Sequence, residues 1–286
     1  MIGRDGAVAL TVRDGLAGLT RYFRDGGIET PGTDARLLLA HVLQVEPGRL
    51  IIMADDPLKE AALERAYVLG ARRRDREPMS HILGGREFYG RWLEVTGDVL
   101  DPRPETETLI EAALRKPFNE VLDLGTGSGA ILVSLLAEKG EATGIGTDLS
   151  GRALAVAEKN AEALGVGERA GFLESDWYAG VAGQFDLIVS NPPYIAADEM
   201  PGLAPELAHE PRMALTDEAD GFSAYRIIAQ EAPEHLLPNG RLMVEIGPTQ
   251  GAVVAAMFRE AGFDSVEILP DLDGRDRVVA GVKPRE

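Results

Sequence analysis

The chain has 286 residues, of which 45% are hydrophobic, and 47 acidic against 29 basic residues give it a formal net charge of -18. This charge disfavours direct nucleic-acid binding, which draws on clustered Lys and Arg to neutralise phosphates. Cysteine is absent, residues 1–10 lack the pattern of a signal peptide, and apolar runs fall far short of a membrane-spanning helix, so we expect a cytoplasmic protein without disulfides or a membrane partner.

The first part of the chain has apolar residues at three- and four-residue spacings, as in Leu16, Leu19 and Phe23, interrupted by Gly-Gly and Pro-Gly pairs. From residue 12 to about residue 77 this pattern predicts three or four short helices. We interpret residues 1–80 as a small helical bundle for substrate recognition, because it holds no catalytic cluster.

Between this bundle and the rest of the chain lies an aromatic and β-branched stretch broken by glycines, residues 87–95. It predicts a β-hairpin within a linker at residues 81–100. After Pro102 and Pro104, residues 105–116 have the charge polarity of a helix, with acidic residues first and basic residues last.

Beyond Pro117 the pattern changes to alternating strands and helices. Such alternation predicts an α/β fold for residues 101–286, with a doubly wound, mainly parallel, Rossmann-like sheet of seven strands whose last two pair antiparallel across a short loop. The predicted strands are 121–124, 142–147, 170–173, 185–190, 241–246, 265–269 and 277–282, and the helices between them are 130–138, 150–164, 222–236 and 249–261.

A glycine-rich turn, Asp123-Leu-Gly-Thr-Gly-Ser-Gly129, joins the first of these strands to a helix. Glycines there let a ligand lie against the backbone, which indicates a nucleotide-like cofactor, although the spacing also fits a dinucleotide. Asp148, at the end of the second strand, is placed to accept hydrogen bonds from two ribose hydroxyls. Trp177 follows the third strand and is either a flat face for an adenine ring or a core residue.

The segment Asn191, Pro192, Pro193 and Tyr194 follows the strand at 185–190, at the edge where doubly wound sheets bind ligands. Its prolines fix the backbone and donate no hydrogen bonds, so it presents carbonyl acceptors in a stiff frame. An ordinary turn is the competing interpretation.

A planar NH2 group, of an amide or an aromatic amine, is a poor nucleophile because its lone pair is delocalised. Two acceptors, the Asn191 side-chain oxygen and the Pro192 carbonyl, would hold its two N–H bonds and direct the lone pair at an electrophilic methyl group. This chemistry needs orientation and electrostatics rather than a metal or a strong base. The four histidines, at positions 41, 81, 209 and 235, likewise show no metal-ligand spacing, and we predict no metal site.

With these motifs the chain resembles the PrmC/HemK family, the release factor glutamine N5-methyltransferases, along nearly its whole length. The similarity extends to Glu87-Phe-Tyr-Gly90, Pro102-Arg-Pro-Glu-Thr-Glu107, His209-Glu-Pro-Arg212, Asp220-Gly221 and Gly274-Arg-Asp-Arg277. Asp101 departs from the family, which usually has an apolar residue there, and this puts the local packing in doubt.

The resemblance implies that the enzyme uses S-adenosylmethionine, releases S-adenosylhomocysteine, and methylates the glutamine of the Gly-Gly-Gln loop of peptide chain release factors, in support of translation termination. The cofactor would contact Gly125, Thr126, Gly127, Ser128, Gly129, Asp148, Trp177 and Asn191. The substrate would be held by Asn191, Pro192, Pro193 and Tyr194, with Asn191, Pro192 and Tyr194 as the catalytic residues.

Four other functions remain to be weighed. An amino-methyltransferase acting on adenine in DNA would share the chemistry, but the acidic charge argues against it. A glutamine methyltransferase acting on a ribosomal protein is harder to separate, because it shares fold and motif. A nicotinamide oxidoreductase or a non-enzymatic nucleotide-binding module would leave residues 191–194 unexplained.

The Arg72-Arg73-Arg74 run ends the helical region. We interpret it as a solvated helix face, with contact to a partner as the alternative.

Overall fold

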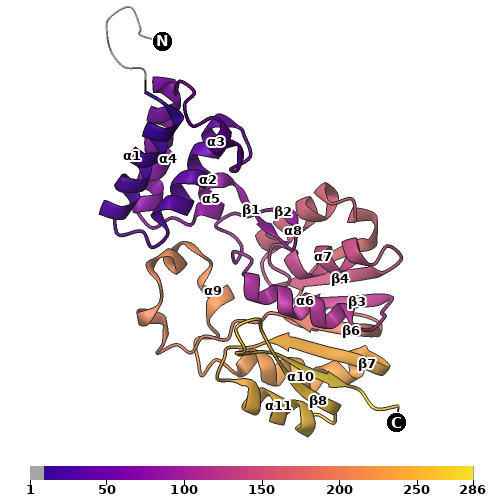
Figure 1. Ribbon diagram of the computed structural model, residues 1–286. Coiled ribbons are helices and arrows are strands. Elements are labelled where there is room, and N and C mark those ends of the chain that lie inside the picture. The colour runs from indigo at the N-terminus through magenta and orange to yellow at the C-terminus, as the bar shows by residue number, and fades with distance from the viewer. Residues whose placement is uncertain (1–9, 286) are drawn as a thin grey trace, which may run out of the picture. The chain divides into compact units, whose positions relative to one another are not determined.

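The computed structural model describes residues 10–285 (Figure 1). The chain forms two compact units, Met1–Gly84 and Gly85–Glu286. In the described residues no helix is both long and apolar enough to cross a membrane.

The described part of the first unit consists of helices packed around one apolar core that includes Leu19, Phe23 and Leu38. The first helix begins at a capping box, in which Thr11 and Asp14 satisfy each other's backbone N–H groups. Four of the helices fall within residues 12–77, as predicted, and a fifth short one follows Pro78. The helices are α1 (Val12–Asp25), α2 (Pro31–Leu43), α3 (Arg49–Ile52), α4 (Glu60–Arg74) and α5 (Met79–Leu83).

The arginine run at the end of α4 is only partly a solvated face. Arg73 is buried, and its Nε donates to the Asp34 carboxylate at 2.7 Å. The guanidinium of Arg74 lies 4.5 Å from the centre of the Tyr22 ring. The interpretation is therefore wrong for Arg73, because a buried cation needs a paired anion and Asp34 supplies one inside this unit.

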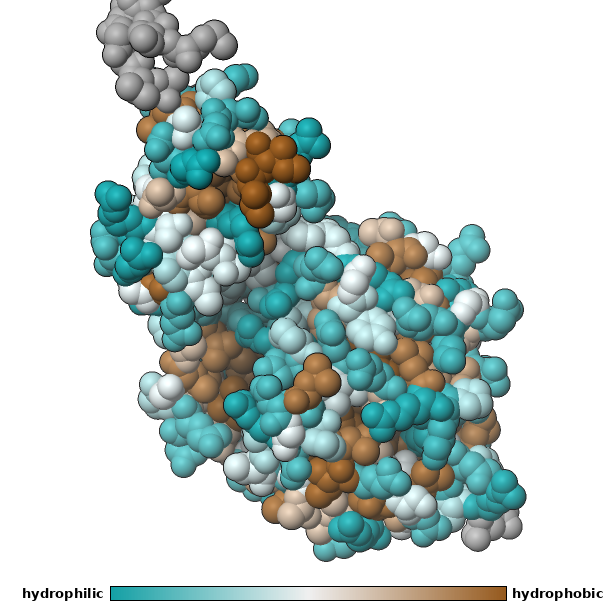
Figure 2. All heavy atoms as spheres, viewed as in Figure 1, coloured by the Kyte–Doolittle hydropathy of each residue, from teal (hydrophilic) through white to brown (hydrophobic). Residues whose placement is uncertain are grey.

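The apolar surface of the first unit is not wholly buried. Ile51 and Ile52, on α3, are 74% and 86% exposed. Figure 2 shows a group of hydrophobic residues on the visible face of this unit, whereas hydrophilic and hydrophobic residues are interspersed over the visible face of the second unit.

The second unit opens with the predicted hairpin, β1 (Gly85–Phe88) paired antiparallel with β2 (Arg91–Glu94). The helix predicted over 105–116 is shorter: a 3-10 turn, η1 (Pro104–Thr106), precedes α6 (Glu107–Leu114). Pro104 cannot supply an interior helical N–H, and Pro117 disfavours helix in the residue before it, so both prolines limit the helix.

The seven-stranded, mainly parallel sheet is confirmed. Its strand order is β5-β4-β3-β6-β7-β9-β8, in which only β9 runs antiparallel to its two neighbours. The strands are β3 (Glu120–Leu124), β4 (Thr143–Asp148), β5 (Ala170–Glu174), β6 (Phe185–Ser190), β7 (Leu236–Glu245), β8 (Asp264–Pro270) and β9 (Asp276–Val282).

One strand differs clearly from its prediction. The strand expected at 241–246 begins at Leu236, directly after the preceding helix, because Leu236 already pairs with Phe185. The Pro238-Asn239-Gly240 stretch has the composition of a turn, but a register shift between β6 and β7 and a positive φ of 62° at Asn239 accommodate it within the strand.

Helices cover both faces of the sheet (Figure 1). On one face, α7 packs against β3 and β4 and α6 packs against β7 and β9, in a core that includes Leu132, Val121 and Leu187, and α8 lies beside α7. On the other face, α10 and α11 pack through Tyr225 and Phe258. These helices are α7 (Ala130–Glu138), α8 (Gly151–Ala163), α10 (Ser223–His235) and α11 (Gly251–Glu260).

The strand order reverses next to β3, because β4 and β5 follow it on one side and β6 and β7 on the other. Ligands of doubly wound sheets bind beyond the carboxyl ends of the strands at such a switch point. The turn after β3 and the segment after β6 lie at this point, which brings residues 125–129 and 191–194 to one edge.

Candidate active site

A cavity of about 490 Å³ lies at this edge of the sheet. It is lined by the turn after β3, the ends of β4 and β5, the segment after β6 and the loop before α10. Of the residues predicted from the sequence, it brings together Gly125, Thr126, Gly127, Ser128, Asp148, Trp177, Asn191 and Pro193. Gly129, Pro192 and Tyr194 are not among its lining residues.

The glycine turn is held open by its backbone geometry. Gly125, Gly127 and Gly129 all have positive φ, of 67°, 55° and 79°. This conformation favours glycine. At Gly127 a Cβ would meet no atom within 4 Å, whereas at Gly129 it would lie 3.1 Å from the Cβ of Ala157. Gly127 therefore borders open space, while Gly129 permits close packing of α7 on α8.

Asp148 fixes the middle of this turn from the end of β4. Its Oδ2 accepts the Gly127 N–H and its Oδ1 accepts the Ser150 N–H, both at 2.9 Å. Burial raises the pKa of Asp148 even though these bonds favour its charged form. Each carboxylate oxygen keeps a lone pair, so the group can still accept hydrogen bonds from hydroxyls in the cavity.

Trp177 lies over the glycine turn. A Cβ built on Gly125 would be 3.8 Å from the ring atom Cζ3, and the ring itself is half-buried and borders the cavity. Its backbone has a positive φ of 49°. Trp177 thus presents a flat apolar face beside the turn, which suits a stacked aromatic ring.

Asn191 has one satisfied and one unsatisfied side-chain group. Its Nδ2 lies 3.4 Å from the Thr106 hydroxyl, whereas its Oδ1 is buried and has no hydrogen-bond partner. The end of β6 before it is anchored by the Ser190 hydroxyl, which donates to the Leu124 carbonyl at 2.7 Å. A buried acceptor without a partner is costly, and a ligand with an N–H group would satisfy it.

Behind Asn191 lies a buried carboxyl group. Glu245, at the end of β7, is 1% exposed, and burial raises its pKa to about 7 although a hydrogen bond from the Thr106 hydroxyl opposes the shift. Thr106 therefore influences both residues: its hydroxyl opposes the rise in the pKa of Glu245 and faces the amide nitrogen of Asn191. This arrangement favours the amide orientation in which the oxygen of Asn191 is left free.

Tyr194 lies in the wall rather than at the surface of the cavity. Its ring packs on the apolar cluster under α10 and α11, and burial raises the pKa of its hydroxyl to about 12. Its backbone carbonyl accepts a hydrogen bond from Gln250 Nε2 at 3.0 Å. The phenol therefore stays protonated at neutral pH.

Asp101, where the resembled family usually has an apolar residue, is buried in a polar network. Its Oδ2 accepts from Arg86 at 3.1 Å and lies 3.7 Å from Arg103, and its backbone N–H donates to Glu210 at 3.1 Å. Arg103 also pairs with Glu210. These ion pairs account for the packing of an aspartate at this position.

Sequence reasoning missed several lining residues. Thr106 and Arg103 belong to the Pro102–Glu107 stretch, which served only to predict a helix and to support the family resemblance, and they lie in and just before the turn η1. Met213 and Asp217 come from the segment between β6 and α10, and Ser223 begins α10. The Asp-rich and Gly-containing end of this segment was the available signal.

Two family models match the chain. Residues 15–84 match the PrmC N-terminal domain, and residues 99–221 match the methyltransferase small domain. The second match contains both the glycine turn and residues 191–194.

Curated relatives match over nearly the full length. A release factor glutamine methyltransferase of Cereibacter sphaeroides is 53% identical over 272 residues, which cover 95% of this chain and 98% of that protein. A protein of the same name from Caulobacter vibrioides is 44% identical, and the match covers 91% of this chain and 92% of that protein.

Among solved structures, a methyltransferase from Pyrococcus furiosus has a similar fold. Its TM-score is 0.53 at 20% identity, and the match covers 69% of this chain and 91% of that one. This likeness concerns the fold.

Proposed function

The chain belongs to the release factor glutamine methyltransferase family, and we propose from this premise that it transfers a methyl group from S-adenosylmethionine to the side-chain amide nitrogen of a release factor glutamine. The proposed target is the glutamine of the Gly-Gly-Gln loop. The observation that carries this proposal is the buried, unpartnered Oδ1 of Asn191 at the wall of the cavity.

The residues present fit the cofactor. Open space beside Gly127 admits a ligand against the backbone, the Asp148 carboxylate has acceptor positions for two ribose hydroxyls, and Trp177 offers a face for the adenine ring. When bound, S-adenosylmethionine supplies an electrophilic methyl group on a positively charged sulfur.

The chain's own groups orient the substrate amide. Asn191 Oδ1 accepts one N–H of the glutamine NH2 group, and the Pro192 carbonyl accepts the other. With both N–H bonds held, the nitrogen lone pair points out of the amide plane toward the methyl donor. The two prolines keep these acceptors rigid, so little reorganisation is needed on the path to the transition state.

The buried side chains support this arrangement without acting as bases on the substrate. The Tyr194 phenol stays protonated, and Glu245 lies behind Thr106. The methylated nitrogen becomes acidic enough to lose its proton to water, so no strong base is needed.

We further propose that three parts of the chain have the separate roles predicted from the sequence. Residues 1–80 recognise the release factor, residues 81–100 link the two parts, and residues 101–286 bind the cofactor and carry out methyl transfer in the cytoplasm, where release factors act. The acidic charge of the chain suits a basic protein partner better than a nucleic acid.

The direct test is mass spectrometry of a purified release factor after incubation with this protein and S-adenosylmethionine. The expected result is the mass gain of one methyl group, mapped to the glutamine of the Gly-Gly-Gln loop. A methyl group found only on a ribosomal protein or on DNA adenine would contradict the proposed substrate, and no transfer to any of them would contradict the activity.

A further inference from the structure

The segment after β6, residues 191–194, is internally stiff but has few backbone donors that could anchor it to the rest of the fold. Pro192 and Pro193 have no N–H, so only carbonyls and the N–H groups of their neighbours are available for hydrogen bonds. The segment is anchored before the prolines by Ser190 and after them by Ile195, whose N–H donates to the Leu215 carbonyl at 3.0 Å. To anchor this segment further, a donor from another part of the chain must reach one of its carbonyl groups.

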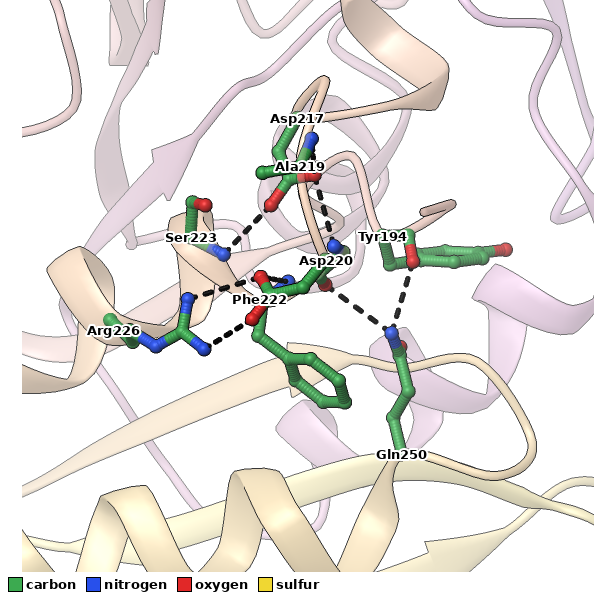
Figure 3. Close-up of polar contacts among 9 residues, drawn as sticks. Tyr194, Asp217, Ala219, Asp220, Phe222, Ser223, Arg226 and Gln250 are labelled. Carbon is green, nitrogen blue, oxygen red and sulfur yellow. Dashed lines mark hydrogen bonds and ion pairs between the residues drawn. The ribbon is translucent and has the colours of Figure 1, made fainter. Parts of the chain in front are cut away.

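Gln250 supplies such a donor from the residue before α11. Its Nε2 donates to the carbonyl of Tyr194 at 3.0 Å and approaches the carbonyl of Gly221 at 3.3 Å. Figure 3 shows the Gln250 side chain directed at Tyr194 and at the loop that carries Asp220. One amide group thus connects the substrate segment with the loop before α10.

The orientation of this amide is fixed by its other contacts. Gln250 Oε1 accepts the Gly247 N–H at 2.9 Å and lies 3.3 Å from the Tyr225 hydroxyl. The Tyr225 hydroxyl also lies 2.9 Å from the Glu245 carbonyl, so the firm donor to Oε1 is the Gly247 N–H. Because two carbonyls face the nitrogen, the reverse orientation would place acceptor against acceptor. Gln250 is only 8% exposed, which excludes water from competing for these bonds.

The loop before α10, residues 217–223, is ordered around Asp217 (Figure 3). The Asp217 carboxylate accepts the N–H groups of Ala219, Gly221 and Ser223 at 2.9, 3.0 and 2.8 Å. Gly221 has a positive φ of 76°, and a Cβ there would lie 2.5 Å from the Tyr194 carbonyl oxygen. The loop therefore packs its backbone directly against the carbonyl that Gln250 binds.

Both connected segments line the cavity, through Asn191 and Pro193 on one side and Asp217 and Ser223 on the other. We propose that Gln250 is a positioning residue for methyl transfer, which locks the Tyr194 carbonyl to the 217–223 loop and so fixes the substrate acceptors at residues 191–192. Gln250 is not among the residues lining the cavity and acts through Tyr194. This role rests on the proposed function, because the acceptors it fixes are those of the substrate amide.

The test compares Gln250→Glu and Gln250→Met with Gln184→Glu as the matched control. Gln184 is an exposed glutamine of the same unit whose Nε2 contacts only the Glu234 carbonyl among the contacts described. Gln250→Glu keeps the acceptors for Gly247 and Tyr225 but replaces the donor to Tyr194 by a carboxylate oxygen. Gln250→Met removes both kinds of contact.

In both variants at position 250 we expect kcat for release factor methylation to fall about tenfold or more, while the affinity for S-adenosylhomocysteine stays within about twofold, since Gln250 does not line the cavity. Lowering the pH should restore part of the activity of Gln250→Glu, because the protonated carboxyl can donate to Tyr194 again. Gln250→Met should show no such recovery, and Gln184→Glu should behave as wild type.

Hydrogen exchange gives a readout that needs no activity. The amides of Ile195 and Ala197, held by Leu215 and Ala219, should exchange faster in both Gln250 variants and normally in Gln184→Glu. Unchanged exchange and kcat within about twofold of wild type would overturn the positioning role. A parallel loss of kcat, cofactor affinity and melting temperature would also overturn it, because such a loss indicates that Gln250 stabilises the fold in general. A wild-type protein that methylates no release factor would refute the proposed function, while the exchange data would still decide the role of Gln250.

Discussion

The side-chain nitrogen of Asn191 faces the hydroxyl oxygen of Thr106 at 3.4 Å, and the side-chain oxygen of the same Asn191 is buried without a partner. The two residues come from different elements, the segment after β6 and the turn η1 before α6. The Thr106 hydroxyl also lowers the pKa of Glu245, and toward Asn191 it accepts the side-chain N–H. The amide of Asn191 is thereby oriented with its acceptor free, and the following predictions test this arrangement and the cofactor site beside it.

Replacing Asn191 by alanine removes the proposed acceptor for the substrate N–H. We expect Asn191→Ala to lower kcat for glutamine methylation by about 100-fold, because an acceptor present mainly for the transition state is lost, while cofactor affinity changes by about twofold or less. Steady-state kinetics and calorimetry measure the two effects. Asn119→Ala, at an exposed asparagine, is the control, and near wild-type turnover of Asn191→Ala would refute the acceptor role.

Replacing Thr106 by valine keeps the volume but removes the hydroxyl between Asn191 and Glu245. We expect Thr106→Val to lower kcat about five- to tenfold, since the Asn191 amide loses its orientation, and Thr106→Ser to recover most of the activity. Kinetics of the two variants under the same conditions decide the point. A loss of activity in Thr106→Ser with none in Thr106→Val would show that packing of the methyl group, rather than the hydroxyl, matters.

Asp148 is expected to act on cofactor binding first. Asp148→Ala removes the proposed ribose acceptors and frees the Gly127 N–H, so the dissociation constant for S-adenosylhomocysteine should rise about tenfold or more in calorimetry. Asp148→Asn keeps one acceptor oxygen and should bind with intermediate affinity. Unchanged affinity in Asp148→Ala would remove this residue from the cofactor site.

The chain has two tryptophans, Trp92 and Trp177, and Trp92 is 55% exposed. In a Trp92→Phe variant, fluorescence reports on Trp177 alone. We expect S-adenosylhomocysteine to quench this emission in a saturable way, because an adenine ring stacked on the indole would perturb its excited state. Cofactor binding detected by calorimetry without any change in emission would contradict the stacking role of Trp177.

Stability should depend on pH through Glu245. Its pKa is raised from 4.5 to about 7 by burial, so between these values the folded state binds more protons than the unfolded state, and the free energy of unfolding falls as pH rises. Asp123, fully buried with its pKa raised to about 7, acts in the same direction. Glu245→Gln should therefore be more stable than wild type at pH 8, by roughly 2 kcal/mol, and nearly equal to it at pH 5. Urea titrations at both pH values measure this, and a difference that does not depend on pH would refute the assignment.

Much of this molecule follows from local sequence. The change from helical to alternating patterns after Pro117 predicts the sheet, since a buried parallel strand needs a continuous apolar run and the crossover helices need the intervening length. The glycine turn and residues 191–194 are recognisable because their backbone requirements, positive φ at Gly125 and fixed angles at Pro192 and Pro193, restrict the residue types allowed.

Local patterns fail where neighbouring segments outweigh them. The Pro-Asn-Gly stretch at 238–240 reads as a turn, yet Leu236 and Arg241 on either side of it both pair with β6, so it forms a bulge within β7. Arg73 reads as part of a solvated run, yet Asp34 pairs with it in the core of the first unit.

The sequence by itself determined the fold class, the family and the two segments that meet at the cavity, because these depend on periodicity and on short motifs with strict backbone demands. Only the tertiary structure decided which groups orient them: Thr106 beside Asn191, Glu245 behind Thr106, and Gln250 on the Tyr194 carbonyl. These partners lie about 50 residues or more along the chain from the segment they support. No local pattern predicts such contacts, because they depend on the spatial order of the strands in the sheet.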